Sequence, residues 1–499
     1  MLLLFFGVLF VFLFLWIRFN LSYWERRGIP GPKPWPIVGN IWPHIIGKKT
    51  LGEVMKDIYK KYEGYPFVGI FRATKPVMLL RDPELVYRVL VKDFKSFRNN
   101  EMFIDKDTDP IFGRNPFILR DQEWKDTRQM LTPGMTSGKM KNMFSTIEVI
   151  NKNFVKYIEN HPTANTDGIE TRALTKRLTL DNVAKAAFGI DGKSFESYND
   201  ISEFNKLVNK FMNPGTLGSI IFYLAQIFPW IFKIKCIKFV SQEVEKRLTE
   251  IISEVVAYRR KNNHKAHDYL QFLIDLSKEK NFGDVEITSH ASTLFIDGYE
   301  TSSLVLSFLL LNLARFPNYQ EKIRKDIKKY EKENNGELTY EAIHEMPWLD
   351  ACFYESLRFS PPVDISTKEC TEPFEYTPTD PEFKKITTKF LPGDIVILPY
   401  GMLPNDEKIF PEANKFKAER MFERDSFQKA TFTPFGSGPR ACIGQRLGIM
   451  QVKLATAYII KNFELSVSPK LKQPISYIPY SFLNEVDGGF WIKYKKIET

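Results

Sequence analysis

The 499-residue chain has 43% hydrophobic and 26% charged residues, an ordinary globular composition that excludes extended disorder. Its net charge of +10 comes with no zinc-finger spacing, aromatic RNA-binding run or basic-zipper pattern, so we expect no nucleic-acid partner. Four cysteines without a C-x-x-C pair, and six scattered histidines, exclude a disulfide framework and a clustered structural zinc site.

The N-terminus is an uninterrupted apolar segment. Residues 1–17 contain no charged side chain and reach the lower length limit for a helix that spans a bilayer. A cleaved signal peptide would need basic residues before this run and a small-x-small site after it, and neither occurs. Arg18, Arg26 and Arg27 instead follow the run, which predicts a retained anchor at residues 1–20 with the body on the cytosolic side. The sequon at Asn20 would then stay unglycosylated.

Prolines dominate the next segment. The stretch from Gly28 to Pro36 reads GIPGPKPWP, in which prolines fix φ and remove amide donors, so no helix continues through it. We expect a stiff extended spacer within a hinge at residues 21–50, although such a run alone could equally be a peptide ligand for an aromatic groove. No internal linker follows, which predicts a single domain at residues 51–499.

The body is expected to be mainly α with small β-sheets (α+β). Strand-like runs occur at residues 66–71, 77–80 and 394–399, and helical patterns dominate residues 121–360. Residues 215–240 are strongly apolar but contain Pro229 and end among lysines. The pattern fits a buried helix pair and a loop that dips into the membrane interface equally well.

A long buried helix is predicted from Ile287 to Phe316, because this run is apolar nearly all round and Pro317 follows it. The sequence Asp297-Gly298-Tyr299-Glu300-Thr301 interrupts it with polar groups that need buried partners. A kinked helix that satisfies its own polar groups would explain the pattern as well as a functional site would.

Glu355 and Arg358 lie three residues apart on a predicted helix, so both side chains share one face and can form an ion pair. This tetrapeptide alone is common on surface helices.

Cys442 lies in the glycine-rich loop FGSGPRACIG, directly before a helical pattern at residues 445–460. Gly436, Gly438 and Gly444 remove Cβ atoms where the chain must turn tightly. A cysteine close to a helix N-terminus is expected to have a lowered thiol pKa, because free amides and the helix dipole stabilise the thiolate.

The fixed positions of this loop are those of F-x-x-G-x-R-x-C-x-G, which resembles the haem loop of the cytochrome P450 family: Phe435, Gly438, Arg440, Cys442 and Gly444. Trp124 and Arg128 match W-x-x-x-R, Glu355 and Arg358 match E-x-x-R, and residues 298–301 resemble the oxygen-activation motif. The resemblance implies haem b between the long central helix and the cysteine-loop helix, with Cys442 as the iron ligand.

The resemblance also assigns roles. Arg440, Trp124, Arg128 and the loop residues Phe435, Gly436, Gly438 and Gly444 would bind haem, with Arg440 and the Trp-Arg pair at the propionates. Glu300 would relay protons and Thr301 would hold a hydrogen-bonded water. Glu355, Arg358 and Arg420 would be structural.

Two residues depart from the family pattern. Asp297 stands where a small apolar residue is usual, and we interpret it as either a neutral acid with raised pKa or a polar anchor for substrate. Lys368 occupies a position where arginine often pairs with a propionate, and it can act only as a point charge.

The leading functional hypothesis is a microsomal monooxygenase that oxidises small apolar substrates on the cytosolic face of the endoplasmic reticulum. The resemblance implies NADPH electrons through NADPH-cytochrome P450 reductase, docking on a basic face that includes Lys125 and Arg446, with cytochrome b5 as a further partner. The residues of the oxygen-activation motif and of the cysteine loop are most similar to those of insect members that metabolise xenobiotics. A biosynthetic role, a haem-thiolate isomerase or lyase, and a haem sensor are the alternatives. The substrate pocket is expected from residues 101–119 and 481–487.

Overall fold

The computed structural model describes residues 2–198, 238–280 and 282–498, with isolated positions between 206 and 234. Most of residues 215–240 lie outside the described part, so the two interpretations of that segment stay predictions. The helices are α1 (Leu2–Leu21), α2 (Tyr23–Arg26), α3 (Trp42–Ile45), α4 (Leu51–Lys61), α5 (Pro83–Tyr87), α6 (Asp121–Leu131), α7 (Ser137–Glu159), α8 (Thr171–Phe188), α11 (Gln242–Lys261), α12 (Tyr269–Lys280), α13 (Asp284–Arg315), α14 (Asn318–Glu333), α15 (Tyr340–Glu345), α16 (Pro347–Phe359), α17 (Ser426–Thr431) and α18 (Gln445–Asn462).

The predicted strands form a mixed sheet. Its order is β1 (Phe67–Arg72), β2 (Lys75–Leu80), β8 (Ile395–Leu398), β5 (Ser366–Glu369) and β3 (Asn99–Asn100). β1 and β2 form an antiparallel hairpin, and β8 joins β2 in parallel with Val77 opposite Ile395. A second sheet has the order β4 (Ile169–Glu170), β10 (Trp491–Lys496) and β9 (Phe463–Val467), and β6 (Phe374–Tyr376) pairs with β7 (Thr388–Phe390). The expectation of a mainly helical body with small sheets is confirmed.

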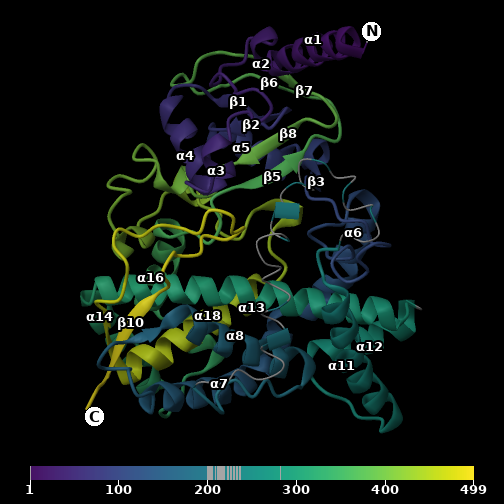
Figure 1. Ribbon diagram of the computed structural model, residues 1–499. Coiled ribbons are helices and arrows are strands. Elements are labelled where there is room, and N and C mark those ends of the chain that lie inside the picture. The colour runs from purple at the N-terminus through teal and green to yellow at the C-terminus, as the bar shows by residue number, and fades with distance from the viewer. Residues whose placement is uncertain are drawn as a thin grey trace.

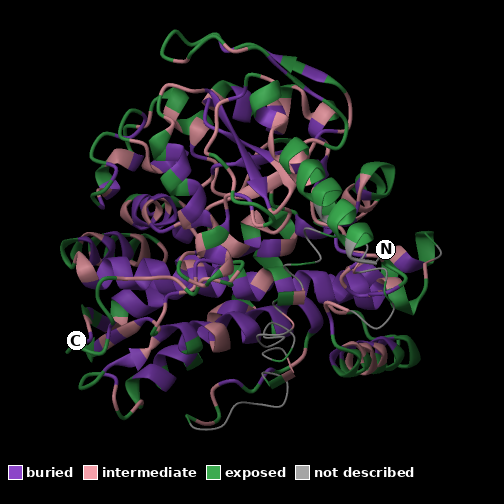
Figure 2. Ribbon diagram, turned by 45° about the horizontal axis from the view of Figure 1, so that its top comes forward, coloured by how far each residue is buried: buried purple, intermediate pink, exposed green. Residues whose placement is uncertain are grey.

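The long helix α13 runs through the middle of the molecule. In Figure 1 it separates the mixed sheet from α7, α8 and α18, and α11 and α12 lie at one of its ends. Hydroxyl side chains let α8 approach closely, because Thr175 Oγ1 donates to the Ser303 carbonyl over 3.0 Å and Thr179 Oγ1 to the Tyr299 carbonyl over 3.0 Å. Figure 2 shows these central helices mostly buried. The polar groups of a buried helix are thus paired between helices.

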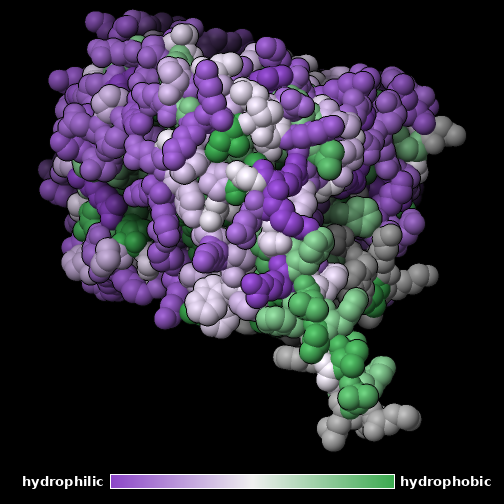
Figure 3. Space-filling view, turned by 90° about the horizontal axis from the view of Figure 1, so that it is seen from above, coloured by the Kyte–Doolittle hydropathy of each residue, from purple (hydrophilic) through white to green (hydrophobic). Residues whose placement is uncertain are grey.

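Within the described part of the chain, two helices have the length and composition of a membrane span. One is Leu4–Leu21 in α1, with mean hydropathy 2.2 and no buried residues, and the other is α13, whose most apolar 18 residues are 78% buried. Because α13 is covered by protein, it is the core helix that its sequence predicts. α1 instead projects from the body as a hydrophobic stalk, visible in green in Figure 3.

The proline-rich segment does not stand away from the body. A Cβ at Gly31 would collide with the Gly69 carbonyl oxygen of β1, and the Gly69 amide donates to the Pro30 carbonyl over 2.8 Å. Trp24 is buried, and its Nε1 donates to the Ile70 carbonyl over 2.8 Å. The segment from Gly28 to Pro36 thus has the extended backbone that its prolines predict, and it packs along β1, where the Pro30 carbonyl accepts from Gly69. Its role as a spacer behind the anchor stays a prediction.

Candidate functional site

The cysteine loop connects α17 to α18 and is closed by a backbone hydrogen bond from the Cys442 amide to the Phe435 carbonyl, 2.8 Å. Gly436 and Gly438 have φ of +71° and +72°, and a Cβ at Gly438 would also clash with the Leu90 carbonyl. Gly444 differs. Its φ is −87° and a Cβ there would meet no protein atom within 4 Å. The turn therefore does not require glycine at 444, which corrects that part of the prediction and leaves open space above the loop.

Cys442 borders a space inside the protein. Its side chain retains accessible surface, yet burial raises the pKa of its thiol above the usual value, with Asp297 raising it further. The Gly444 amide and Arg128 lower the pKa of the thiol, but by less than burial raises it. The predicted lowering by the helix N-terminus is thus wrong for the protein alone, because desolvation outweighs the amide and the dipole. A thiolate here needs a cation bound directly to sulfur.

Asp297 and Thr301 line the same internal space. They lie one turn apart and are exposed, whereas their neighbours on α13 are largely buried. The Gly298 carbonyl, in the same turn, accepts from Gln451 of α18, the helix that follows the cysteine loop, and Asp297 is close enough to raise the pKa of Cys442, so this face of α13 lies towards that loop. Thr301 Oγ1 donates to the Asp297 carbonyl over 2.8 Å. The polar interruption in the sequence therefore faces the cysteine.

The backbone of this turn is held by side chains from two neighbouring helices. The Gly298 carbonyl accepts from Gln451 Nε2 of α18 over 2.8 Å, and Thr179 of α8 bonds the next carbonyl. α13 nevertheless remains one continuous helix. These bonds to the α13 carbonyls fix the position of Asp297 and Thr301 relative to α18.

Asp297 is held from the opposite side. Asn115 Nδ2 donates to Asp297 Oδ2 over 3.1 Å, which brings a residue of the 101–119 segment to the site. Burial raises the pKa of Asp297 to about 6, although the Asn115 bond lowers it in part. The raised pKa agrees in direction with the neutral-acid hypothesis, and the exposed side chain agrees with the substrate-anchor hypothesis.

Glu300 points away from this space. Its carboxylate is buried against α8, where Oε1 lies 2.5 Å from Arg172 Nη2 and 2.9 Å from Lys176 Nζ. Burial alone would raise the pKa of Glu300, but Arg172 and Lys176 hold it below its usual value. The residue is therefore an ionised carboxylate that points about 100° away from Thr301 around α13, and it must turn to reach the internal space.

Three cations gather beside the cysteine loop. Arg440 donates to the carbonyls of Arg98, Pro116 and Leu119 over 2.9 Å each, and its guanidinium lies 4.1 Å from the Trp124 ring centroid. Arg128 Nη2 donates to the Ala441 carbonyl over 2.7 Å. Lys368 in β5 is buried beside Arg440.

These cations lack carboxylate partners. Among the described residues, no ion pair joins Lys368, Arg128 or Arg440 to an acid. Burial, with Arg440 nearby, lowers the pKa of Lys368 to about 7, and burial lowers that of Arg440 to about 9. One buried and two half-buried cations without counterions predict an anionic ligand. A haem fits this site, because its two propionates would supply negative charge beside these cations and its iron would bind the Cys442 sulfur.

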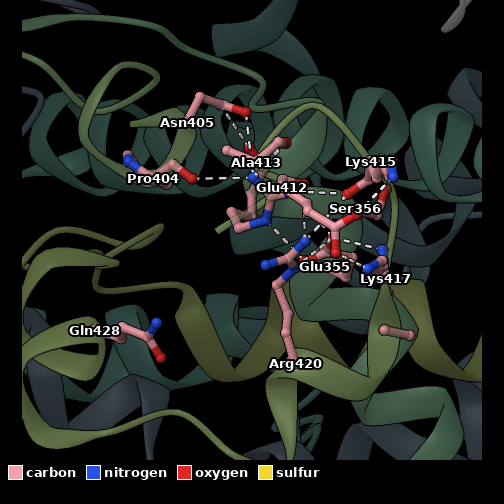
Figure 4. A network of polar contacts seen from close by, with 12 residues as sticks. Glu355, Ser356, Pro404, Asn405, Glu412, Ala413, Lys415, Lys417, Arg420 and Gln428 are labelled. Carbon is pink, nitrogen blue, oxygen red and sulfur yellow. Dashed lines mark hydrogen bonds and ion pairs between the residues drawn. The ribbon is translucent and has the colours of Figure 1, made fainter. Parts of the chain in front are cut away.

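The predicted structural cluster forms between α16 and residues 404–420. Glu355 and Arg358 are both fully buried and pair over 2.8 Å, and Arg420 Nε lies 3.1 Å from Glu355 Oε1. Figure 4 shows Arg420 and the Lys417 backbone converging on Glu355. Arg358 also donates to the carbonyls of Pro404 and Ala413. The cluster thus fixes residues 404–420 to α16.

Sequence reasoning missed Arg172, Lys176, Asn115 and Gln451. None of them lies in a recognisable motif, and each acts through contacts across more than 120 residues of sequence. One signal was available: Arg172 and Lys176 are spaced by one helical turn in a segment rich in buried residues, and paired buried cations require an acidic partner.

Known proteins are similar to this chain in amino-acid sequence. The family model for "Cytochrome P450" matches residues 29–491. "Probable cytochrome P450 28d1" of Drosophila melanogaster is 32% identical over 97% of this chain and 96% of its own length. "Cytochrome P450 9e2" of Blattella germanica is 32% identical over 95% and 93%, and "Probable cytochrome P450 6a23" of Drosophila melanogaster is 32% identical over 95% of both. The chain therefore belongs to the cytochrome P450 family, the haem-thiolate monooxygenases, and is similar along nearly its whole length to insect members.

Proposed function

We propose that the chain is a membrane-anchored monooxygenase that oxidises small apolar substrates, foreign compounds in particular, with electrons from NADPH. The overall reaction joins substrate, O2, NADPH and a proton to give the oxidised substrate, water and NADP+. The observation that carries the proposal is that the exposed faces of Cys442 and of Asp297 and Thr301 border one internal space. Bound haem b would supply the iron at which dioxygen is activated.

The residues around this space would divide the work. Cys442 would ligate the iron, while Arg440, Arg128, Trp124 and Lys368 would bind the propionates. The Phe435 ring stacks on the Phe353 ring, with 6.4 Å between the ring centroids, and this contact fixes the start of the loop. Thr301 already carries a hydroxyl whose proton is directed to the Asp297 carbonyl, so its oxygen is free to accept from a water. That water would deliver protons at the reacting oxygen.

Glu300 would bring protons from the α8 side to Thr301. Its two cationic partners keep it ionised in the buried position. Leaving that position weakens both ion pairs and lets the carboxylate take a proton, which it then carries on turning. The proposed role therefore requires movement of this side chain.

We further propose residues 1–20 as an anchor in the endoplasmic reticulum membrane, residues 21–50 as a hinge and residues 51–499 as the catalytic domain on the cytosolic face. The exposed apolar helix α1 and the arginines after it support this orientation. Exposed Lys125 and Arg446 would take part in docking NADPH-cytochrome P450 reductase, and cytochrome b5 would be a second electron donor. Glycosylation of Asn20 in microsomes would contradict the orientation.

The alternative functions differ in the residues that they require. A biosynthetic monooxygenase acting on an endogenous lipid or hormone would use the same residues. A haem-thiolate isomerase or lyase, or a haem sensor, would not need Glu300 and Thr301 for proton delivery. Spectral shifts across a panel of foreign compounds and endogenous lipids would separate the substrate classes.

The first test is the reduced carbon monoxide difference spectrum of the full-length protein in microsomes. We expect the thiolate band in the wild type and in Cys370→Ala, which changes a buried cysteine away from the loop. Cys442→Ala should lose it. NADPH-dependent turnover with added reductase then separates a monooxygenase from an isomerase, a lyase or a sensor. Absence of such turnover for all ligands that shift the spectrum would contradict the proposal.

A further inference from the structure

Arg172 is shared by two carboxylates from distant parts of the chain. It is buried in α8, and its Nη2 lies 2.5 Å from Glu300 Oε1 and 2.5 Å from Glu485 Oε1. Its Nε also donates to both oxygens of Glu485, over 3.0 and 2.9 Å, and its Nη1 donates to Ser303 Oγ. The Glu485 carboxylate is thus bound by two guanidinium nitrogens, Nε and Nη2. The Glu300 carboxylate is bound by Nη2 alone, which also binds Glu485.

Glu485 is held by a turn near the C-terminus. Tyr477 and Val486 form an antiparallel bridge, and the Ile478 amide donates to the Glu485 carbonyl over 2.8 Å. Asn484, next to it, bonds the carbonyls of Pro361 and Pro362 over 2.8 and 2.9 Å. The position of Glu485 is therefore set by two segments of backbone and not by Arg172 alone.

The charges in this cluster balance. Arg172 and Lys176 face Glu300 and Glu485, and these four side chains are largely buried, with exposures of 7%, 23%, 7% and 17%. Because one guanidinium serves both carboxylates, any change in its pairing with Glu485 alters the pairing with Glu300. If Glu485 lost its charge, Arg172 would be free to bind the Glu300 carboxylate through two of its nitrogens.

We propose that Glu485 is a positioning residue for proton delivery: by sharing Arg172, it keeps the hold on Glu300 weak enough for that carboxylate to leave α8. The inference rests on the proposed role of Glu300. It adds a control of that role from the turn at residues 477–486, in which Glu485 is 313 residues away from Arg172 in sequence. Loss of the Glu485 charge should immobilise Glu300 without changing the residues that face Cys442.

The test uses the full-length holoenzyme reconstituted with reductase and a fluorogenic alkoxycoumarin that the wild type turns over. Slow proton delivery diverts electrons to hydrogen peroxide, so the readouts are peroxide released per NADPH oxidised and the solvent isotope effect in D2O. For Glu485→Gln we expect about a fivefold rise in peroxide yield and a larger isotope effect. Loss of a proton-transfer group slows catalysis by roughly 100-fold or more, and Glu485 acts on that group only indirectly, so turnover should fall by less than this. The carbon monoxide spectrum should stay normal.

Asp167→Asn is the matched control, because it removes a surface carboxylate just before α8, where Asp167 pairs with Lys470. It should keep the wild-type peroxide yield. Glu485→Asp keeps the charge but shortens its reach, and it carries the test if Glu485→Gln does not fold. A raised peroxide yield with a normal spectrum would support the inference for either variant.

Glu300→Gln separates the two proposals. If it raises the peroxide yield while Glu485→Gln and Glu485→Asp match the wild type, the inference is wrong and the role of Glu300 stands. If Glu300→Gln itself matches the wild type, the role of Glu300 fails and the inference fails with it. An equal rise in Asp167→Asn would show a general effect of removing a carboxylate and would also overturn the inference.

Discussion

Asn115 Nδ2 donates to Asp297 Oδ2 over 3.1 Å and joins the segment before α6 to the centre of α13. The orientation of this amide is fixed, because Asn115 Oδ1 accepts from the Phe117 amide over 2.7 Å. Asn115 is almost fully buried, whereas Asp297 is exposed to the internal space. Asp297 therefore has one oxygen committed to the protein and one available to a ligand.

The first prediction concerns Asp297→Ala. Ligands that carry a hydrogen-bond donor should bind about tenfold more weakly to this variant, since a hydrogen bond to a charged group contributes about 1.5–3 kcal/mol. Their analogues without the donor should bind equally well or better. Spectral titrations with matched ligand pairs measure this difference. Asp284→Ala, at the exposed start of the same helix, is the control. Unchanged ligand preference and turnover would exclude the role as a substrate anchor.

α13 shows how far the sequence leads. Its apolar run predicts a helix from Ile287 to Phe316, and the structure has Asp284 to Arg315. The earlier start follows from polar residues, because Glu286 accepts from the Gly283 amide and completes the first turn. Such capping lies outside the hydrophobic pattern, so periodicity alone does not find it.

The sequence could not predict in which direction the Glu300 side chain points. The motif indicates an acid beside Thr301, but successive residues of a helix point about 100° apart, and only α8 shows where Glu300 is held. The pKa of Cys442 was predicted in the wrong direction for a related reason. The loop sequence reveals the helix N-terminus, whereas the desolvation that prevails comes from the surrounding fold.

The second prediction concerns Lys368→Met. This variant should release haem roughly tenfold faster than the wild type, because a buried charged hydrogen bond to a propionate contributes about 1.5–3 kcal/mol. Lys368→Arg should retain haem, since it restores the cation. Transfer of haem to a haem-scavenging globin, followed by absorbance, measures the rate without reference to activity. Lys125→Met, at an exposed position on α6, serves as control. Equal release rates for the wild type and Lys368→Met would show that Lys368 makes no propionate contact.

The third prediction concerns Glu355→Gln. Arg358 would then lose its fully buried partner and Arg420 would lose its carboxylate, so the free energy of unfolding should fall by about 3–5 kcal/mol. Urea denaturation followed by tryptophan fluorescence measures the loss. Glu412→Gln removes a carboxylate that pairs with Lys415 at the surface nearby, and it should change stability little. A loss as small as that of the control would mean that the cluster is not needed for folding.

The last prediction concerns His290, which lies on α13 seven residues before Asp297 and is almost fully buried. Burial lowers the pKa of His290 to about 4, from 6.5 for an ordinary histidine, although Glu286 raises it in part. The unfolded chain therefore takes up the proton at higher pH than the folded chain does. The stability that neutral His290 contributes is complete above about pH 6.5 and is lost as the pH falls towards 4.

The loss amounts to about 3 kcal/mol, at 1.36 kcal/mol for each unit of pKa difference. Urea denaturation at pH values from 7 to 4 should therefore show a steeper fall in stability for the wild type than for His290→Gln, which has no proton to bind. His267→Gln changes an exposed histidine and should follow the wild type. Parallel curves for the wild type and His290→Gln would mean that water reaches His290 in the folded protein, which the packing of α13 does not allow.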